Sequence, residues 1–149
     1  MKILLATVSP RRGALTGPSA ELLRMYLERC ARYAPCDQRT FATEAKLLAS
    51  LTAGGRTLPV LVLTDSRGKQ LNSEEFAATL GSFQDTGAQQ LVVAIGPADG
   101  WSPDALQRAN LTIAFGRITL PHELAAVVAA EQIYRALTIR AGHPYHTGH

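Results

Sequence analysis

Hydrophobic residues along the chain follow two alternating arrangements. Short apolar runs, typical of buried strands, occupy residues 3–8, 59–63, 90–95 and 111–115, and residues 38–41 are a candidate for a further short strand. Between these runs, apolar residues recur at helical spacing or follow helix-start signals, which predicts helices over residues 19–32, 44–51, 73–85 and 102–109. Because strand and helix alternate almost throughout, the pattern predicts an α/β fold with a mostly parallel sheet.

Two serines mark expected helix starts in the second half of the chain. Ser73 is expected to cap one helix, with Glu74 and Glu75 favourably placed in its first turn. Ser102 is expected to cap the short helix that follows. These caps define where the connections after two of the strands should end.

The last helical segment is apolar at seven consecutive positions, Leu124–Ala130. Such a helix has no single apolar stripe, so it must be covered on more than one side. We expect one side to lie on the sheet and the other to contact a second copy of the chain. A chain of 149 residues cannot easily surround the helix, and closed two-fold dimers are the commonest oligomers. The alternative is a helix buried entirely inside one subunit.

Three loops that follow strands are expected to form one ligand crevice. In open α/β sheets, ligands bind beyond the carboxyl ends of the strands, where loops opening at Thr64, Gly96 and Gly116 would meet. The chain has no glycine-rich phosphate fingerprint and no phosphate loop. The crevice is therefore predicted to hold its ligand mainly through backbone groups and apolar walls.

Composition adds limits on class and compartment. The length predicts one domain, residues 1–149, and the net charge of +3 with a pI of about 9.1 permits an RNA partner without requiring one. Cys30 and Cys36 match neither a redox pair nor half of a usual zinc site. No segment approaches membrane-spanning length, and the apolar start lacks a cleavage-site pattern. We expect a soluble, cytoplasmic protein without a membrane partner.

Three motifs in the last third of the chain carry a resemblance to a known family. They are Thr119-Leu120-Pro121-His122, Glu131-Gln132 with Tyr134-Arg135-Ala136, and Pro144-Tyr145-His146. In this order they resemble the SPOUT methyltransferases, and within them a divergent member of the RlmH family. That family methylates N3 of a pseudouridine in 23S rRNA. The similarity extends back to about residue 58, so it covers most of the chain from there onward.

The resemblance implies a fold, a cofactor and an assembly. It implies a deep C-terminal trefoil knot, with the knot and crevice within about residues 91–140 and a flexible tail over 141–149. It also implies an obligate homodimer and S-adenosylmethionine as the cofactor. Carried over by position, the cofactor-binding residues are Thr64, Gly96, Phe115, Gly116, Arg117, Ile118, Thr119 and Leu120.

Methylating a ring nitrogen requires removal of its proton and an in-line approach to the methyl group. Four residues are candidates for this chemistry: His122, Arg135, Tyr145 and His146. We expect the tail to close over an active site, either that of its own subunit or that of the partner, with His146 contacting the target base. His122 has a structural role as its alternative, and Arg135 has an ion pair with Glu131 as its alternative.

Other polar residues are candidates for phosphate or metal binding. Scattered solvated charges are the default for the basic residues, although they are also candidates for a phosphate-binding surface. The histidines at every third position of the tail lack acidic or cysteine ligands nearby, so no metal site is predicted. The basic set comprises Arg11, Arg12, Arg56, Arg67, Lys69, Arg117 and Arg140, and the histidines are His143, His146 and His149.

Two alternatives compete with a 23S rRNA methyltransferase. The first is a catalytically impaired knotted dimer that binds cofactor or RNA, motivated by Pro97 and Ala126 where the family usually has glycine and arginine. The second is a flavodoxin-like or receiver-type domain. The latter is disfavoured because no acidic pair follows the first strand to bind a metal.

Overall fold

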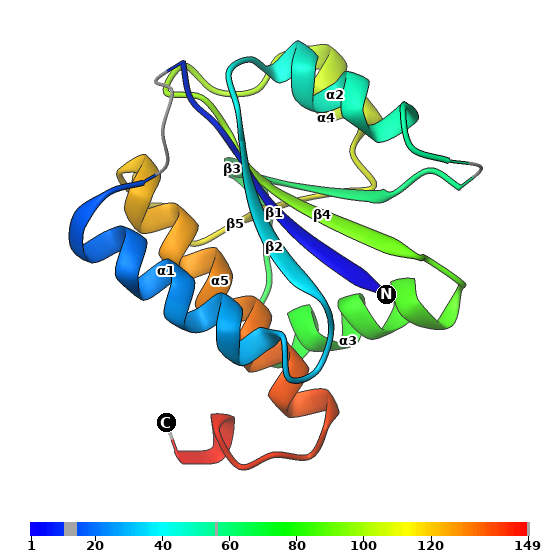
Figure 1. The fold of residues 1–149 in the computed structure, drawn as a ribbon, viewed down its shortest axis with the longest axis vertical. Coiled ribbons are helices and arrows are strands. Elements are labelled where there is room, and N and C mark those ends of the chain that lie inside the picture. The colour runs from blue at the N-terminus through cyan, green and yellow to red at the C-terminus, as the bar shows by residue number, and fades with distance from the viewer. Residues whose placement is uncertain (11–14, 56, 149) are drawn as a thin grey trace.

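The computed structural model describes residues 1–10, 15–55 and 57–148. Strands and helices alternate along this part of the chain, as the sequence predicts (Figure 1). The strands are β1 (Lys2–Val8), β2 (Cys36–Phe41), β3 (Val60–Gln70), β4 (Gln90–Ile95) and β5 (Leu111–Ala114). The helices are α1 (Gly17–Cys30), α2 (Glu44–Thr52), α3 (Ser73–Asp85), α4 (Pro103–Arg108), α5 (His122–Arg140) and the 3-10 turn η1 (His146–Gly148).

The five strands form one sheet in the order β2-β1-β4-β3-β5, and every neighbouring pair is parallel. Helices α1, α3 and α5 cover one face of the sheet, while α2 and α4 cover the other (Figure 1). This arrangement confirms the predicted α/β fold with a parallel sheet. Because all strands run the same way, their carboxyl ends share one edge of the sheet.

The core follows the two-residue period of the strands. In β4, Leu91, Val93 and Ile95 pack with α1, α3 and α5, whereas Val92 and Ala94 pack with α2 and α4. All five of these side chains are buried. A strand that is buried on both faces reads as a continuous apolar run, which is why the sequence predicts β4 well.

The third strand is longer than the expected run over residues 59–63. β3 continues to Gln70, so the residues expected to open a crevice loop at Thr64 belong to the strand. Its pairing with β5 shifts between Thr64 and Lys69, which both pair with Ile113. Gly68 lies at the closest approach, where an added Cβ would be 2.6 Å from the Ile113 carbonyl carbon. β3 leaves β4 after Thr64, which opens space at the sheet edge.

Helix caps agree with the sequence at one of the two predicted positions. Ser102 caps α4 by accepting a hydrogen bond from the Ala105 N–H at 3.2 Å. The cap of α3 is Asn72 instead of Ser73, because the Asn72 Oδ1 accepts from the Glu75 N–H at 2.8 Å. Glu75 returns the contact to the Asn72 N–H, which completes a capping box.

The last helix, α5, is covered within one chain to a greater extent than its apolar run suggests. It packs between α1 and α3 on one face of the sheet, which buries residues on several of its sides. Seven of its 19 residues are buried, and the others are half-buried or exposed in the single chain. Two large apolar side chains stay exposed near its start, Ile118 at 70% and Leu124 at 46%.

Candidate functional site

A cleft of about 410 Å³ lies at the carboxyl ends of β3, β4 and β5. Its volume falls within the range of small-molecule sites. It is lined by residues after all three strands and by the first turns of α5, namely Thr64, Asp65, Ser66, Ile95, Gly96, Pro97, Ala98, Gly100, Trp101, Phe115, Gly116, Ile118, Thr119, Leu120, Pro121, His122 and Ala125. The three segments that the sequence expects at one crevice therefore meet there.

Most of the expected cofactor-binding residues lie on the wall of this cleft. Those on the wall are Thr64, Gly96, Phe115, Gly116, Ile118, Thr119 and Leu120. Arg117 is absent from the lining, and its side chain is exposed. Gly116 has a φ of 99°, a backbone conformation that favours glycine at this bend.

Trp101 forms one wall of the cleft and fixes two of its strands. Its indole N–H donates to the Thr64 carbonyl oxygen at 2.9 Å, and the Thr64 hydroxyl donates to the Ala94 carbonyl oxygen at 3.0 Å. The ring lies so close to Gly96 that an added Cβ there would be 2.8 Å from it. The sequence suggests only packing for Trp101, because nothing in its local pattern indicates a ligand wall.

His122 stands at the start of α5 on the rim of the cleft. Its Nδ1 lies 3.3 Å from the Gly96 carbonyl oxygen, which joins the helix to the loop after β4. This contact matches the structural alternative for His122. The residue still faces the cleft, so it is also placed to touch a bound ligand.

Asp65 brings a negative charge to the cleft. Its carboxylate accepts from the Arg67 backbone N–H at 2.8 Å and from the Arg67 guanidinium at 2.9 Å. These bonds, with the side-chain bond foremost, lower the pKa of Asp65 below its usual range. The side chain of Asp65 is 7% exposed and that of Arg67 is 68% exposed. Asp65 is thus an ionised acceptor at the site, and Arg67 is engaged with it.

A second polar cluster lies at the other end of α5, centred on Glu131. Its carboxylate accepts from the Arg135 guanidinium at 2.5 Å, from the Tyr145 hydroxyl at 3.0 Å and from the Gln132 side-chain amide at 2.7 Å. The ion-pair alternative for Arg135 is therefore present. Burial, together with the Glu131 carboxylate, raises the pKa of Tyr145. Tyr145 is consequently a neutral hydrogen-bond donor at physiological pH.

Both ring nitrogens of His146 are engaged in this second cluster. The Arg135 Nη1 lies 3.0 Å from the Nδ1 of His146, and the Glu74 Oε1 lies 2.8 Å from its Nε2. Arginine can only donate, so Nδ1 accepts and Nε2 carries the proton that is donated to Glu74. The contact with His146 lowers the pKa of Glu74. Neither nitrogen of His146 is open to accept a substrate proton in this arrangement.

The first turn of α3 completes the cluster. The Ser73 hydroxyl donates to the Gln132 side-chain oxygen at 2.8 Å, and Glu74 follows Ser73 in the same turn. The sequence gives Ser73 and Glu74 only helix-start roles and leaves Gln132 without one. Their contacts with α5 and the tail join residues 59 and 72 positions apart, which local patterns do not reveal.

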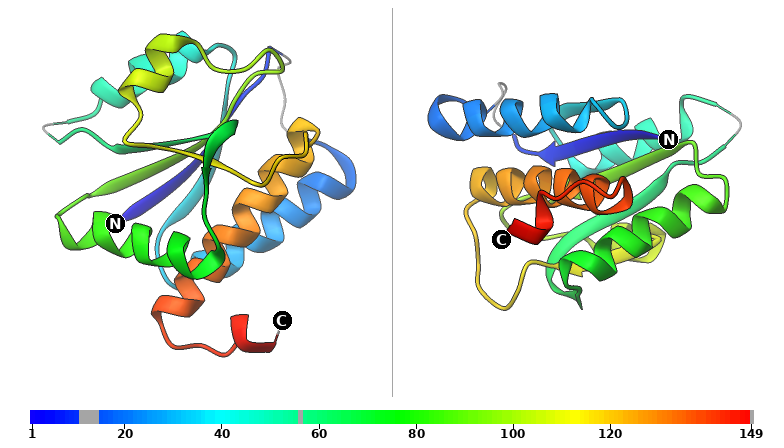
Figure 2. Two further views of the ribbon diagram at one scale, coloured as in Figure 1. Left: turned by 180° about the vertical axis from the view of Figure 1, so that it is seen from behind. Right: turned by 90° about the horizontal axis from the view of Figure 1, so that it is seen from below.

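One chain does not bring the four candidate catalytic residues together. His122 lies at the cleft, whereas Arg135, Tyr145 and His146 contact one another through Glu131 and Arg135. His122 and Arg135 are thirteen residues apart on α5, so they are about 20 Å apart along the helix axis. Figure 2 shows the tail beyond the C-terminal end of α5, away from the segment that leads into that helix. The tail does not lie over the cleft of its own subunit.

The remaining candidates do not form one surface. Arg140 covers Gly81 of α3 at the far end of α5, whereas Arg67 and Lys69 lie in β3. Arg11, Arg12, Arg56 and His149 lie outside the described residues. Among the described residues, no three His, Cys, Asp or Glu side chains are grouped to hold a metal ion. No helix within the described ranges is both long and apolar enough to cross a bilayer.

The two departures from the family pattern occupy different environments. Pro97 lines the cleft, where it supplies no backbone N–H donor. Ala126 is fully buried in the core between the helices and the sheet, whereas its neighbour Ala125 lines the cleft. Ala126 therefore reaches neither the cleft nor solvent in one subunit.

Comparison with known proteins identifies the class. The family model described as "Predicted SPOUT methyltransferase" matches residues 1–146, so the chain belongs to the SPOUT methyltransferases. The solved structure of the SpoU methyltransferase AviRb from Streptomyces viridochromogenes, in complex with the cofactor AdoMet, shares the fold. The TM-score is 0.52 at 15% identity, with coverage of 95% of this chain and 59% of that one.

Curated relatives are similar over most of their length. The chain is 51% identical over 124 residues to the ribosomal RNA large subunit methyltransferase H of Koribacter versatilis, which covers 83% of this chain and 85% of the relative. It is 41% identical over 146 residues to the protein of the same name from Rhizobium rhizogenes, with coverage of 88% and 91%. The resemblance found in the sequence motifs is thereby confirmed.

Proposed function

We propose that this SPOUT methyltransferase transfers a methyl group from S-adenosylmethionine to the ribosomal RNA of the large subunit. The observation that carries the proposal is the cleft at the carboxyl ends of β3, β4 and β5, in a chain that matches curated ribosomal RNA methyltransferases at up to 51% identity. Within the rRNA, we propose N3 of a pseudouridine in 23S rRNA as the acceptor, because the motifs at residues 119–122, 131–136 and 144–146 resemble the family with that specificity.

The residues of the cleft fit the proposed cofactor. Gly96 and Gly116 expose backbone groups, Ile118 and Leu120 add apolar surface, and Asp65 provides a carboxylate for a hydroxyl or amine. Bound there, S-adenosylmethionine would supply an electrophilic methyl group. We propose that the cofactor-binding residues are Thr64, Gly96, Phe115, Gly116, Ile118, Thr119 and Leu120.

The tail residues suit a supporting role for the acceptor base. The ring nitrogen must lose its proton before transfer, and a positive charge nearby favours the resulting anion. The Arg135 side chain is 13% exposed and carries that charge. Tyr145 is held by Glu131, and His146 is held by Arg135 and Glu74. We propose that these two fixed side chains contact and orient the base while Arg135 stabilises its anion.

A homodimer through α5 is proposed because one chain leaves its site incomplete. Two copies of α5 packed in opposite directions would bring the tail of each subunit toward the cleft of the other. The exposed Ile118 and Leu124 near the start of α5 provide apolar surface for such a contact. A deep trefoil knot in the C-terminal part and a cytoplasmic location are expected from the family and its ribosomal substrate.

Calorimetric titration with S-adenosylmethionine, followed by methyl transfer to ribosomes from cells that lack the modification, tests the proposal. We expect micromolar binding, about 8 kcal/mol, and incorporation of one methyl group at a pseudouridine of 23S rRNA. Binding without transfer would instead support the knotted dimer as a cofactor- or RNA-binding module. Absence of both would contradict the proposal.

A further inference from the structure

All four tyrosines of the chain gather at one end of the molecule, in a group that we call the tyrosine cluster: Tyr26, Tyr33, Tyr134 and Tyr145. Tyr134 is its centre. Its ring centroid lies 6.3 Å from those of Tyr26 and Tyr33, and 4.7 Å from that of Tyr145 in an edge-to-face contact. The cluster joins α1, α5 and the tail, next to the residues proposed to act on the target base.

Burial falls from the centre of the tyrosine cluster to its edge. Tyr134 is 9% exposed, whereas Tyr33 is 37% exposed and belongs to the large apolar side chains that face solvent. Packing alone accounts for Tyr134 and Tyr145, because their contact holds the tail against α5. It does not account for an aromatic ring that is placed at the edge and left open on one side.

Two arginines, Arg29 and Arg32, lie at the same edge. The Arg29 guanidinium lies 5.6 Å from the ring centroid of Tyr26 and 5.9 Å from that of Tyr134. Arg32 is exposed and precedes Tyr33 directly. Within residues 1–10, 15–55 and 57–148, neither arginine takes part in an ion pair. Their positive charges are therefore available to an anionic partner, unlike that of Arg135, which Glu131 engages.

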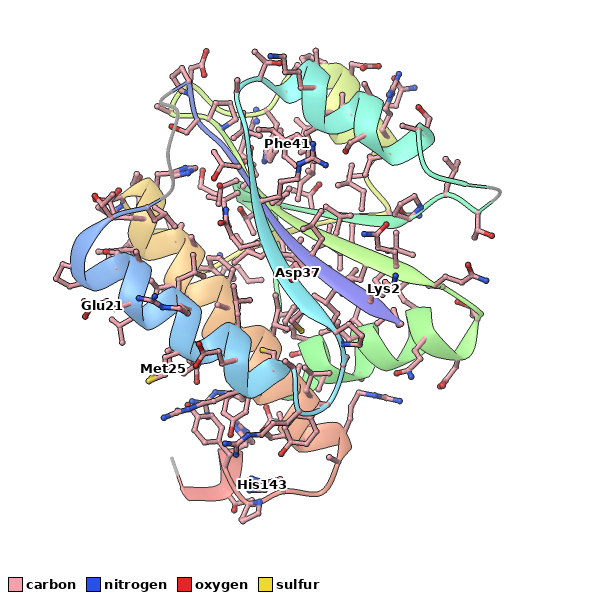
Figure 3. The ribbon with its side chains drawn as sticks, in the orientation of Figure 1. Lys2, Glu21, Met25, Asp37, Phe41 and His143 are labelled. Carbon is pink, nitrogen blue, oxygen red and sulfur yellow. The ribbon has the colours of Figure 1, made fainter. Side chains whose placement is uncertain are left out.

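The face of α1 that carries these residues is distinct from its acidic side. Tyr26 and Arg29 are three positions apart on α1, and Tyr33 follows in the turn after that helix. The rings of Tyr26 and Tyr33 both contact that of Tyr134 in α5. Glu28 instead lines a groove between α1 and β2, together with Asp37. Figure 3 labels Glu21 on α1 and His143 in the tail beyond the C-terminal end of α5.

We propose that Tyr33, Arg29 and Arg32 bind a single-stranded segment of the RNA substrate that flanks the target nucleotide. An open tyrosine ring stacks on a base of any sequence, and unpaired arginines contact the neighbouring phosphates. Continuity with the tail through Tyr134 and Tyr145 places this surface beside the proposed catalytic residues. The inference rests on the proposed function only in taking ribosomal RNA as the substrate.

Equilibrium binding to large ribosomal subunits, purified from cells that lack the modification, tests this surface. We expect Tyr33→Ala to weaken binding by about 5- to 150-fold, the range for losing one stacked base, and Tyr33→Phe to bind like the wild type. The Arg29→Ala/Arg32→Ala double variant should reduce the magnitude of the slope of log affinity against log salt by about 1.4, as expected for two lost phosphate contacts. Arg108→Ala, which removes an exposed arginine already paired with Asp104, is the matched control and should change neither quantity.

Three further readouts separate this proposal from others. Calorimetric titration with S-adenosylmethionine should give wild-type affinity for every variant, because the residues lie outside the cleft. Sedimentation should show an unchanged oligomeric state; dissociation of Tyr33→Ala would assign the face to subunit contact and overturn the RNA proposal. Wild-type affinity of Tyr33→Ala for ribosomal subunits would also overturn it. Binding that depends on Tyr33, without methyl transfer, would support the RNA-binding proposal and contradict the proposed enzymatic function.

Discussion

The two ends of α5 differ in the groups that they present. At its start, the cleft is built from glycines, apolar side chains and backbone carbonyls, and His122 contacts the Gly96 carbonyl oxygen. At its end, Glu131, Arg135 and His146 form a chain of charged and polar contacts. The first end is suited to hold a cofactor, and the second is suited to position a base and stabilise its anion. About 20 Å of helix separates them, which is the reason for our proposal that two subunits contribute to each complete site.

Removing the His146 side chain should distinguish most clearly between the roles of the two ends of α5. We expect His146→Ala to lower methyl transfer by about 100-fold, because the variant loses a group that orients the acceptor base. Cofactor affinity should stay within twofold, since His146 is proposed to contact the acceptor base and not the cofactor. Single-turnover transfer and calorimetric titration measure the two effects. His143→Ala, an exposed change in the same tail, should retain most activity; equal activity of His146→Ala and wild type would remove His146 from the mechanism.

The ion pair between Glu131 and Arg135, near the C-terminal end of α5, should also stabilise the folded chain. Glu131→Ala leaves the largely buried Arg135 guanidinium without its carboxylate and the Tyr145 hydroxyl without its acceptor. We expect the free energy of unfolding to fall by about 2–3 kcal/mol, measured by urea denaturation. Asp104→Ala removes a carboxylate at the same i,i+4 spacing from an exposed pair with Arg108. That control should change stability by less than about 0.5 kcal/mol, and equal losses in both variants would argue against a special role for Glu131.

A substitution in the cleft at the start of α5 should change only the affinity for the cofactor. In Gly96→Ala the new methyl group would lie 2.8 Å from the Trp101 ring, so the ring must move and the cleft wall with it. We expect S-adenosylmethionine affinity to fall about tenfold, in line with the usual cost of overpacking. Gly54→Ala adds a methyl group to open space and should leave affinity unchanged. Wild-type affinity in Gly96→Ala would show that Trp101 is not a fixed wall of the binding site.

The smallest expected effect concerns the titration of Glu74. Its pKa is lowered in the folded chain, chiefly by the hydrogen bond with His146. Because the carboxyl pKa is lower in the folded chain, the contact stabilises the docked tail fully at pH values above the pKa of the unfolded chain, about 4.3. This stabilisation is lost as the pH falls through the pKa of the folded chain. Carboxyl-resolved NMR titration should show the pKa of Glu74 returning toward its ordinary range in His146→Ala. An unchanged pKa of Glu74 in that variant would mean that His146 does not contact it in solution.

Local patterns predict most of the fold, because the central strands β1 and β4 are buried on both faces and form apolar runs between the helical segments. They missed the continuation of β3 to Gln70, since Asp65, Ser66, Arg67 and Gly68 read as a polar turn. The extension depends on pairing with β5, and Gly68 permits the close approach to Ile113. Such tertiary pairing overrides the local preference of these residues.

The cleft was easier to predict from the sequence than the cluster around Glu131, because the two depend on different kinds of contact. Loops after parallel strands must meet at one sheet edge, so the positions of Thr64, Gly96 and Gly116 at one cleft follow from the sequence order. The cluster around Glu131 depends on contacts between segments distant in the chain, such as Glu74 with His146. The role of Trp101 likewise depends on a contact that its local pattern does not reveal, because its ring packs where Gly96 has no side chain.

Complementation between two defective subunits tests the central claim most directly. A Gly96→Val chain has an obstructed cleft with an intact tail, and a His146→Ala chain has an intact cleft with a defective tail. After subunit exchange, half of the dimers are hybrid and each has one complete site, so the mixture should regain about a quarter of wild-type methyl transfer. Activity no greater than that of the two parent proteins, in a mixture shown to contain hybrid dimers, would contradict a site assembled from the cleft of one subunit and the tail of the other.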